Sequence, residues 1–146
     1  FTMVPPYFLG DMIKNYRSST LRTLIGHNLK ILATGGAPIQ KETIRNFSEA
    51  NLEVFQGYGL SENTSVVSWT YPGPNEIGSV GKPLAHCKVK INEEGQIEVS
   101  GESLFLGYVQ SGRFKSQNSE WFNTGDNGYF DSNGNLYVTG RDANLL

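Results

Sequence analysis

The spacing of hydrophobic and polar positions along this chain changes near residue 70. Before that point, apolar residues recur at helical intervals over 9–16 and 21–25, which predicts two helices. A short apolar run over 30–34 ends at two glycines and predicts a buried strand that meets a turn. The first part of the chain is therefore expected to mix helices and strands.

A further helix and a second strand are expected next. Ile44 and Phe47 lie three positions apart on an apolar face, which predicts a helix from Pro38 through Ala50. The segment 52–56 predicts a strand that leads directly to a second group of glycines. Strands in such a strand, helix, strand unit are parallel, with a right-handed crossover.

Each of these two predicted strands is followed by a glycine-rich turn. Ligands of an open parallel sheet bind in the crevice outside the carboxyl ends of its strands. Because both turns lie at that edge, we expect them to face one crevice. The turns are formed by Gly35, Gly36, Ala37 and Pro38, and by Gly57, Tyr58 and Gly59.

The second half has the alternating pattern of antiparallel strands. We interpret the fold class as α/β: residues about 1–70 form part of a parallel α/β sheet lobe. Residues about 75–142 form a small antiparallel β sheet or distorted open barrel. A Pro- and Gly-rich stretch, 71–75, marks the boundary. Strands are predicted at 88–92 and 97–100, which make a hairpin, and at 103–108, 128–130 and 136–139.

Composition and charge exclude several classes of function. The chain has 146 residues, of which 38% are hydrophobic, and a net charge of −2 without a basic stripe, which argues against nucleic acid or an anionic membrane as a partner. No apolar run is long enough to span a bilayer. The single Cys87 excludes an internal disulfide, and with two histidines it leaves too few ligands for zinc. It fits a reducing compartment, so we expect a cytoplasmic protein.

The hexapeptide 57–62 combines the chemical groups of a nucleotide site. Tyr58 offers a ring that can stack on a base, and the flanking glycines expose backbone amides. The Ser61 hydroxyl can hold a phosphate oxygen, and the Glu62 carboxylate can bind magnesium. A glycine-rich turn whose tyrosine only packs would contain the same residues, so the hexapeptide alone leaves both interpretations open.

Two charged residues of the second half are further candidates. The Asp126 carboxylate can accept two hydrogen bonds at once, as the two hydroxyls of a ribose require. Arg141 offers a planar fork of donors that never loses its charge. Taken singly, each also fits a solvated surface position.

Six short motifs, in this order, resemble the adenylate-forming superfamily. That superfamily contains the acyl- and aryl-CoA synthetases, firefly luciferase and the adenylation domains of nonribosomal peptide synthetases. The resemblance covers nearly the whole chain, from about Val4 to its end. The motifs are Gly-Gly-Ala-Pro at 35–38, Gly-Tyr-Gly-Leu-Ser-Glu at 57–62, Gly-Ser-Val-Gly-Lys-Pro at 78–83, Gly-Glu-Ser-Leu-Phe-Leu-Gly-Tyr at 101–108, Thr-Gly-Asp-Asn-Gly-Tyr-Phe at 124–130 and Gly-Arg-Asp at 140–142.

The resemblance implies an enzyme that activates a carboxylic acid with ATP and magnesium as an acyl-adenylate. The acyl group then passes to coenzyme A or to the phosphopantetheine of a carrier protein. Ser61, where the family usually has Thr, would direct its hydroxyl at the α-phosphate, and Glu62 would bind magnesium; these two are the implied catalytic residues. The resemblance also implies the residues that bind the cofactor. The adenine and acyl pocket would be lined by Gly35, Gly36 and Ala37, and the adenine would lie at Gly57, Tyr58 and Gly59. The α-phosphate would be bound by Ser61, the ribose by Asp126, the base or ribose edge by Val138, and the ribose or phosphates by Arg141.

The resemblance also implies parts that this sequence lacks. The chain starts without Met and ends on an apolar pair, so we expect an internal fragment of a large N-terminal domain. A phosphate-binding loop would precede Phe1, and residues 143–146 would begin the link to a C-terminal domain with the catalytic lysine. The isolated fragment is therefore expected to be inactive. Ala143 stands where the family commonly has Asp or Lys at the hinge, so the sequence does not identify the hinge residue.

Two other functions stay open beside a fatty-acid or related acyl-CoA synthetase. One is an adenylation domain that loads an amino acid or another acid onto a carrier protein. The other is a module that binds an adenylate without chemistry. The sequence identifies neither the acid nor the oligomeric state.

Overall fold

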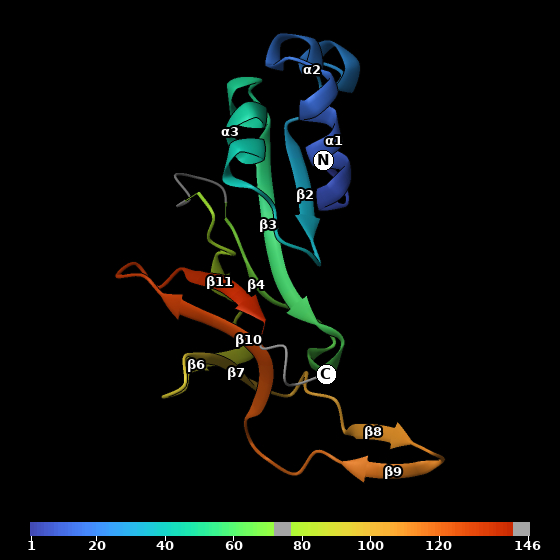
Figure 1. Ribbon diagram of the computed structural model, residues 1–146, viewed down its shortest axis with the longest axis vertical. Helices are drawn as coiled ribbons and strands as arrows, with labels where there is room; N and C mark the ends of the chain where they lie inside the picture. Colours follow the sequence, from blue (N-terminus) through green and yellow to red (C-terminus); the bar gives the residue numbers. More distant parts are fainter. Residues whose placement is uncertain (72–76, 142–146) are drawn as a thin grey trace.

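The computed structural model describes residues 1–71 and 77–141 of the chain. The α-helices gather at one end of an elongated molecule, and an antiparallel sheet lies toward the other end (Figure 1). The long strand β3 runs between these ends. The helices are α1 Pro6–Asn15, α2 Ser18–Ile25, α3 Lys41–Glu49 and the short 3-10 helix η1 Ser61–Asn63.

The first part of the chain builds a five-stranded sheet in the order β1-β2-β3-β4-β5. β2 and β3 pair in parallel and α3 connects them, which confirms the predicted strand, helix, strand unit. β4 and β5 join the same sheet in antiparallel fashion. The strands are β1 Thr2–Met3, β2 Ile31–Gly35, β3 Glu53–Leu60, β4 Ser65–Trp69 and β5 Lys82–Pro83.

The apolar faces of the helices form the first core with the sheet. α1 buries Leu9, and α3 buries Thr43 and Phe47, which lie four positions apart and so share one helix face. Burial stabilises the fold by about 1.5–3 kcal/mol for each large apolar side chain. α3 begins at Lys41, three residues later than predicted, because the chain stays extended at its N-cap and Ile39 packs against this core from outside the helix.

The glycines at 57–59 do not form a turn, and that prediction was wrong. β3 continues through them to Leu60, since Gly57 pairs with Gly35 on one side and with Trp69 on the other. The reversal comes afterwards, in η1 and at Thr64, which has the left-handed φ of 51°. The hexapeptide is therefore mostly strand, and only its last two residues enter the bend.

A four-stranded antiparallel sheet in the order β11-β10-β7-β6 follows. Its β6–β7 hairpin and its β10–β11 pair confirm the strands predicted there. Val67 of β4 belongs to the same buried cluster as Ile97, Val99 and Leu136, so the two sheets share a core. This arrangement confirms the predicted fold class. The strands are β6 Cys87–Ile91, β7 Gln96–Gly101, β10 Phe122–Phe130 and β11 Leu136–Arg141.

The strand predicted over 103–108 is only partly present. Residues 103–106 are not in a strand, because Ser103 and Phe105 hydrogen-bond with η1 and the residue after it instead of with a neighbouring strand. A separate two-stranded hairpin then projects from the molecule (Figure 1). It consists of β8 Gly107–Gln110 and β9 Arg113–Ser116.

The predicted division near 71–75 stays a prediction, since residues 72–76 lie outside the described part. The five-stranded sheet does extend past it, through β5. The expected link at 143–146 and the hinge question at Asp142 and Ala143 also fall outside the described residues. No helix of the described part is long and apolar enough to cross a membrane.

Candidate functional site

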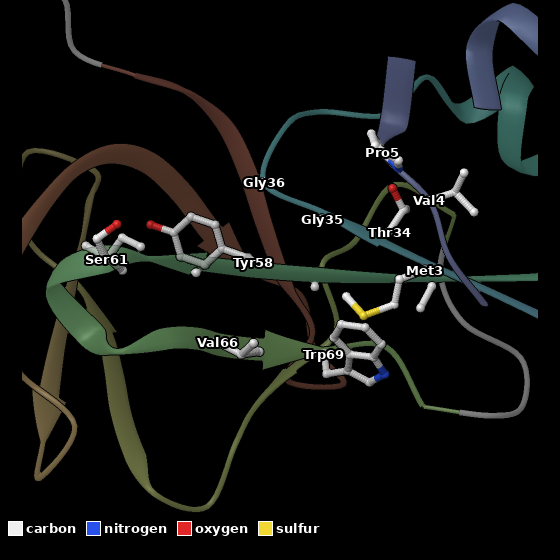
Figure 2. A pocket seen from close by; sticks show the side chains of 14 residues that line it. Met3, Val4, Pro5, Thr34, Gly35, Gly36, Tyr58, Ser61, Val66 and Trp69 are labelled. Atoms are coloured by element: carbon white, nitrogen blue, oxygen red, sulfur yellow. The ribbon is translucent and has the colours of Figure 1, made fainter. Parts of the chain in front are cut away.

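A cavity of about 740 Å³ opens where β1, β2 and β3 lie side by side. In Figure 2 the polar side chains of Tyr58 and Ser61 lie toward one end of it, and the apolar Met3, Val4 and Trp69 toward the other. Six of the predicted site residues line this cavity: Gly35, Gly36, Gly57, Tyr58, Gly59 and Ser61. Ala37, Glu62, Asp126, Val138 and Arg141 do not line it.

The bare backbone at two glycines gives the cavity its shape. A Cβ on Gly35 would lie 2.9 Å from the carbonyl oxygen of Gly57, and a Cβ on Gly57 would lie 2.5 Å from the Trp69 ring. Side chains there would have to displace a strand or that indole. Glycine at position 35 therefore lets β2 approach the backbone of β3, and glycine at position 57 lets Trp69 lie against β3 and form part of the cavity wall.

Tyr58 connects the cavity to the second sheet. Its hydroxyl donates to Asp126 Oδ2 at 2.7 Å, and Asp126 Oδ1 pairs with Arg141 Nε at 3.0 Å. Burial raises the pKa of Tyr58, and the hydrogen bond to Asp126 raises this pKa further. The phenol therefore stays neutral and remains a donor at ordinary pH.

The backbone of β10 holds Asp126 in place. Asp126 N–H donates to Thr124 Oγ1 at 3.1 Å, and Thr124 Oγ1 donates to the Ile97 carbonyl at 2.9 Å. The Asp126 side chain is only 13% exposed. Each carboxylate oxygen has one partner and can accept another hydrogen bond, so the pair of oxygens can still receive two ribose hydroxyls.

Val138 and Ala37 do not line the cavity. Val138 lies in β11 opposite Gly128 and packs against the core of the second sheet, as Tyr58 also does, but it does not line the cavity. Ala37 follows the end of β2, in the bend between β2 and α3. The structure thus gathers the glycines, Tyr58 and Ser61 around the cavity and joins Asp126 and Arg141 to them through Tyr58.

Glu62 lies in η1, one residue beyond the cavity-lining Ser61. Its Oε1 accepts a hydrogen bond from the Tyr108 hydroxyl at 2.8 Å. Among the described residues there is no group of three or more His, Cys, Asp or Glu side chains that could hold a metal. Magnesium commonly binds through one or two carboxylates together with substrate phosphates and water, so Glu62 fits that kind of site.

Two residues with a place in this site were missed by the sequence predictions. Trp69 was missed because β4 was not predicted, although the run at 66–69 is β-prone and apolar. Tyr108 is the last residue of one of the six motifs. It was missed because it lies 46 positions from Glu62, and nothing in the sequence indicated that the two side chains are in contact.

The comparisons with known proteins agree with this geometry. The family described as AMP-binding enzyme matches residues 1–109. The chain is 33% identical over 128 residues to long-chain-fatty-acid–CoA ligase FadD15 of Mycobacterium bovis, covering 86% of this chain and 21% of the ligase. It is 34% identical over 132 residues to 2-succinylbenzoate–CoA ligase of Bacillus licheniformis, covering 82% of this chain and 28% of that ligase.

A solved structure has the same fold. O-succinylbenzoate coenzyme A synthetase (MenE) from Bacillus subtilis, in complex with ATP and magnesium ion, matches with a TM-score of 0.73 and 27% identity. The match covers 99% of this chain and 32% of that one. The chain therefore spans about a fifth to a third of the length of these relatives. The resemblance drawn from the six motifs is confirmed, and the chain belongs to the AMP-binding enzyme family.

Proposed function

We propose that this chain is part of an AMP-forming acid–CoA ligase. Such an enzyme activates a carboxylic acid with ATP as an acyl-adenylate and then transfers the acyl group to coenzyme A. The observation that carries the proposal is the cavity at the ends of β2 and β3, with Tyr58 hydrogen-bonded to Asp126 beside it. The relatives named above, which are CoA ligases for different acids, support it.

The adenosine would lie along Tyr58. Its ring lines the cavity and is held from its hydroxyl end, so it offers a fixed aromatic face to a base. Asp126, whose two oxygens each retain acceptor capacity, would receive the ribose hydroxyls. Arg141 would then hold the carboxylate in its orientation.

The reacting groups would meet near Ser61 and Glu62. Attack of a carboxylate on the α-phosphate brings two anions together, so the site must position them and offset their charge. Ser61 would donate its hydroxyl to a phosphate oxygen from the cavity wall. Glu62 would hold a magnesium ion, which neutralises phosphate charge when it is bound.

The apolar end of the cavity would take the hydrocarbon part of the acid. Met3, Val4 and Trp69 line this end and offer no charged group to pair with a substrate amine. An amino acid is therefore a poorer fit to the described part of the cavity than a fatty or other weakly polar acid.

The free thiol of Cys87 suits a reducing compartment, and we propose a cytoplasmic location on that ground.

The experiment is an acid screen with the full-length protein that contains this chain. ATP–pyrophosphate exchange is measured with fatty, aromatic and amino acids, each with and without magnesium. The proposal predicts exchange that requires both a weakly polar acid and magnesium. Exchange supported only by amino acids would favour loading of a carrier protein, and a protein that binds ATP without any exchange would contradict the proposal.

A further inference from the structure

The hydroxyl of Tyr108 lies 2.8 Å from Glu62 Oε1, although the two residues are 46 positions apart. We propose that Tyr108 is a positioning residue, which fixes the Glu62 carboxylate in the orientation needed to bind the metal ion. The inference rests on the function proposed above. It adds a residue of the β8–β9 hairpin to a site otherwise built from the cavity end of β3 and from β10 and β11.

The backbone around Glu62 is held by the same segment that carries Tyr108. Phe105 N–H donates to the Glu62 carbonyl at 2.7 Å. Two neighbouring contacts, Ser103 Oγ to Asn63 Oδ1 at 2.9 Å and Thr64 Oγ1 to the Ser103 carbonyl at 2.7 Å, tie the same two stretches together. The contact between Tyr108 and Glu62 thus belongs to a continuous set of hydrogen bonds between the two stretches.

The Tyr108 ring is itself held in place. It packs edge-on against Phe105, with ring centroids 4.7 Å apart, and Phe105 packs edge-on against Phe122 at 5.3 Å. Gly107, directly before it, has a φ of 149°, and a Cβ there would lie 2.1 Å from the Lys115 carbonyl oxygen. The backbone and the aromatic contacts therefore aim the phenol at Glu62 before any ligand binds.

The chemistry of this donor suits a metal-binding carboxylate. A neutral phenol orients the carboxylate without cancelling its charge, whereas a lysine or arginine would compete with the cation. The described residues include no cation paired with Glu62, and none of them hydrogen-bonds its second oxygen, Oε2. That oxygen remains available to a metal ion.

The test compares four forms of the full-length protein: wild type, Y108F, E62Q and the double variant. Y108F removes one oxygen atom and leaves the ring on Phe105, so the fold is retained. Mn²⁺ binding is measured by calorimetry with a non-hydrolysable ATP analogue present, and nucleotide affinity without metal serves as the reference. Y129F is the matched control, because Tyr129 is also 49% exposed but stacks on Tyr137, away from Glu62.

We expect Y108F to weaken Mn²⁺ binding by about tenfold or more and to leave metal-free nucleotide binding unchanged. Y129F should leave both affinities unchanged. In the E62Q background, Y108F should cause no further loss, because the carboxylate that it orients is already gone. Unchanged Mn²⁺ affinity in Y108F, or an equal loss in both backgrounds, would overturn the role of Tyr108. If E62Q itself bound Mn²⁺ as tightly as wild type, the proposed metal role of Glu62 would fail instead.

Discussion

Tyr58 and Asp126 join the five-stranded and the four-stranded sheet through a hydrogen bond of 2.7 Å between side chains 68 positions apart. The bond places a carboxylate from β10 beside an aromatic ring from β3. Arg141 holds the other oxygen of the same carboxylate. Two residues proposed to bind adenosine are therefore fixed relative to each other by direct contact.

Replacing Asp126 by Ala should raise the KM for ATP in the full-length enzyme. The ribose would lose hydrogen bonds to a charged acceptor, each worth about 1.5–3 kcal/mol. The measurement is the ATP dependence of pyrophosphate exchange. D11A, at an exposed position of α1 where the carboxylate pairs with Lys14, serves as the control and should leave KM unchanged. A D126A enzyme with the ATP KM of wild type would refute the ribose assignment.

Replacing Tyr58 by Phe should lower the free energy of unfolding by about 1–3 kcal/mol. The change keeps the ring but leaves Asp126 Oδ2 without its donor in a largely buried position. Urea unfolding followed by tryptophan fluorescence gives the measurement. Y129F removes a hydroxyl from a half-exposed ring and should have a smaller effect. Equal unfolding free energies for Y58F and wild type would show that the bond contributes nothing.

Replacing Gly57 by Ala should destabilise the protein by about 1–3 kcal/mol and raise the KM for the acid. The new methyl group would lie 2.5 Å from the Trp69 ring and would push that indole into the cavity. G10A is the matched control, since a Cβ there meets nothing within 4 Å. That change in α1 should stabilise slightly, because Ala favours helix over Gly.

Whether Trp69 is the obstacle can be checked with a second variant. Adding W69L to G57A should restore the acid KM toward that of W69L alone, since the clashing ring is gone. Persistence of the full G57A defect in the double variant would mean that the strand backbone, and not the indole, limits this position.

Replacing Asp131 by Asn should reduce the loss of stability at acid pH. Hydrogen bonds from Asn135 and Asn133 lower the pKa of Asp131 in the folded protein below its ordinary value of 3.8. A carboxyl with a lowered folded pKa stabilises the protein above its unfolded pKa, and this contribution is lost as pH falls through the folded pKa. Unfolding free energies at pH 5 and pH 3 should therefore differ less in D131N than in wild type. The Asp131 side chain is exposed, so the effect of D131N on this pH dependence should be small. A larger difference between pH 5 and pH 3 in D131N than in wild type would contradict a lowered pKa of Asp131.

The local patterns of this sequence predicted most of the fold. The spacing of Ile44 and Phe47 predicted α3, and the alternation of polar and apolar residues predicted β6 and β7. Both patterns depend only on residues that are neighbours in the chain. The glycines at 57 and 59 were taken for a turn because glycine permits one. In fact Gly57 is bare because Trp69, twelve positions away, packs against it.

The site was predicted as a set of residue types and not as a geometry. Gly35, Gly36, Tyr58 and Ser61 line one cavity as expected, since the ends of parallel strands share an edge. The contacts of Tyr58 with Asp126 and of Tyr108 with Glu62 could not be predicted, because they join segments that meet only when both sheets have formed. Val138 does not line the cavity and packs against the second core, as Tyr58 also does, so its place at the nucleotide stays a prediction.

The most direct test of the central claim is product analysis of the full-length enzyme with ATP, magnesium, coenzyme A and an acid that supports exchange. The account predicts release of AMP and pyrophosphate in equal amounts with the acyl-CoA formed, and loss of all three products when the acid is omitted. Release of ADP and inorganic phosphate, or AMP formation that does not depend on the acid, would contradict it.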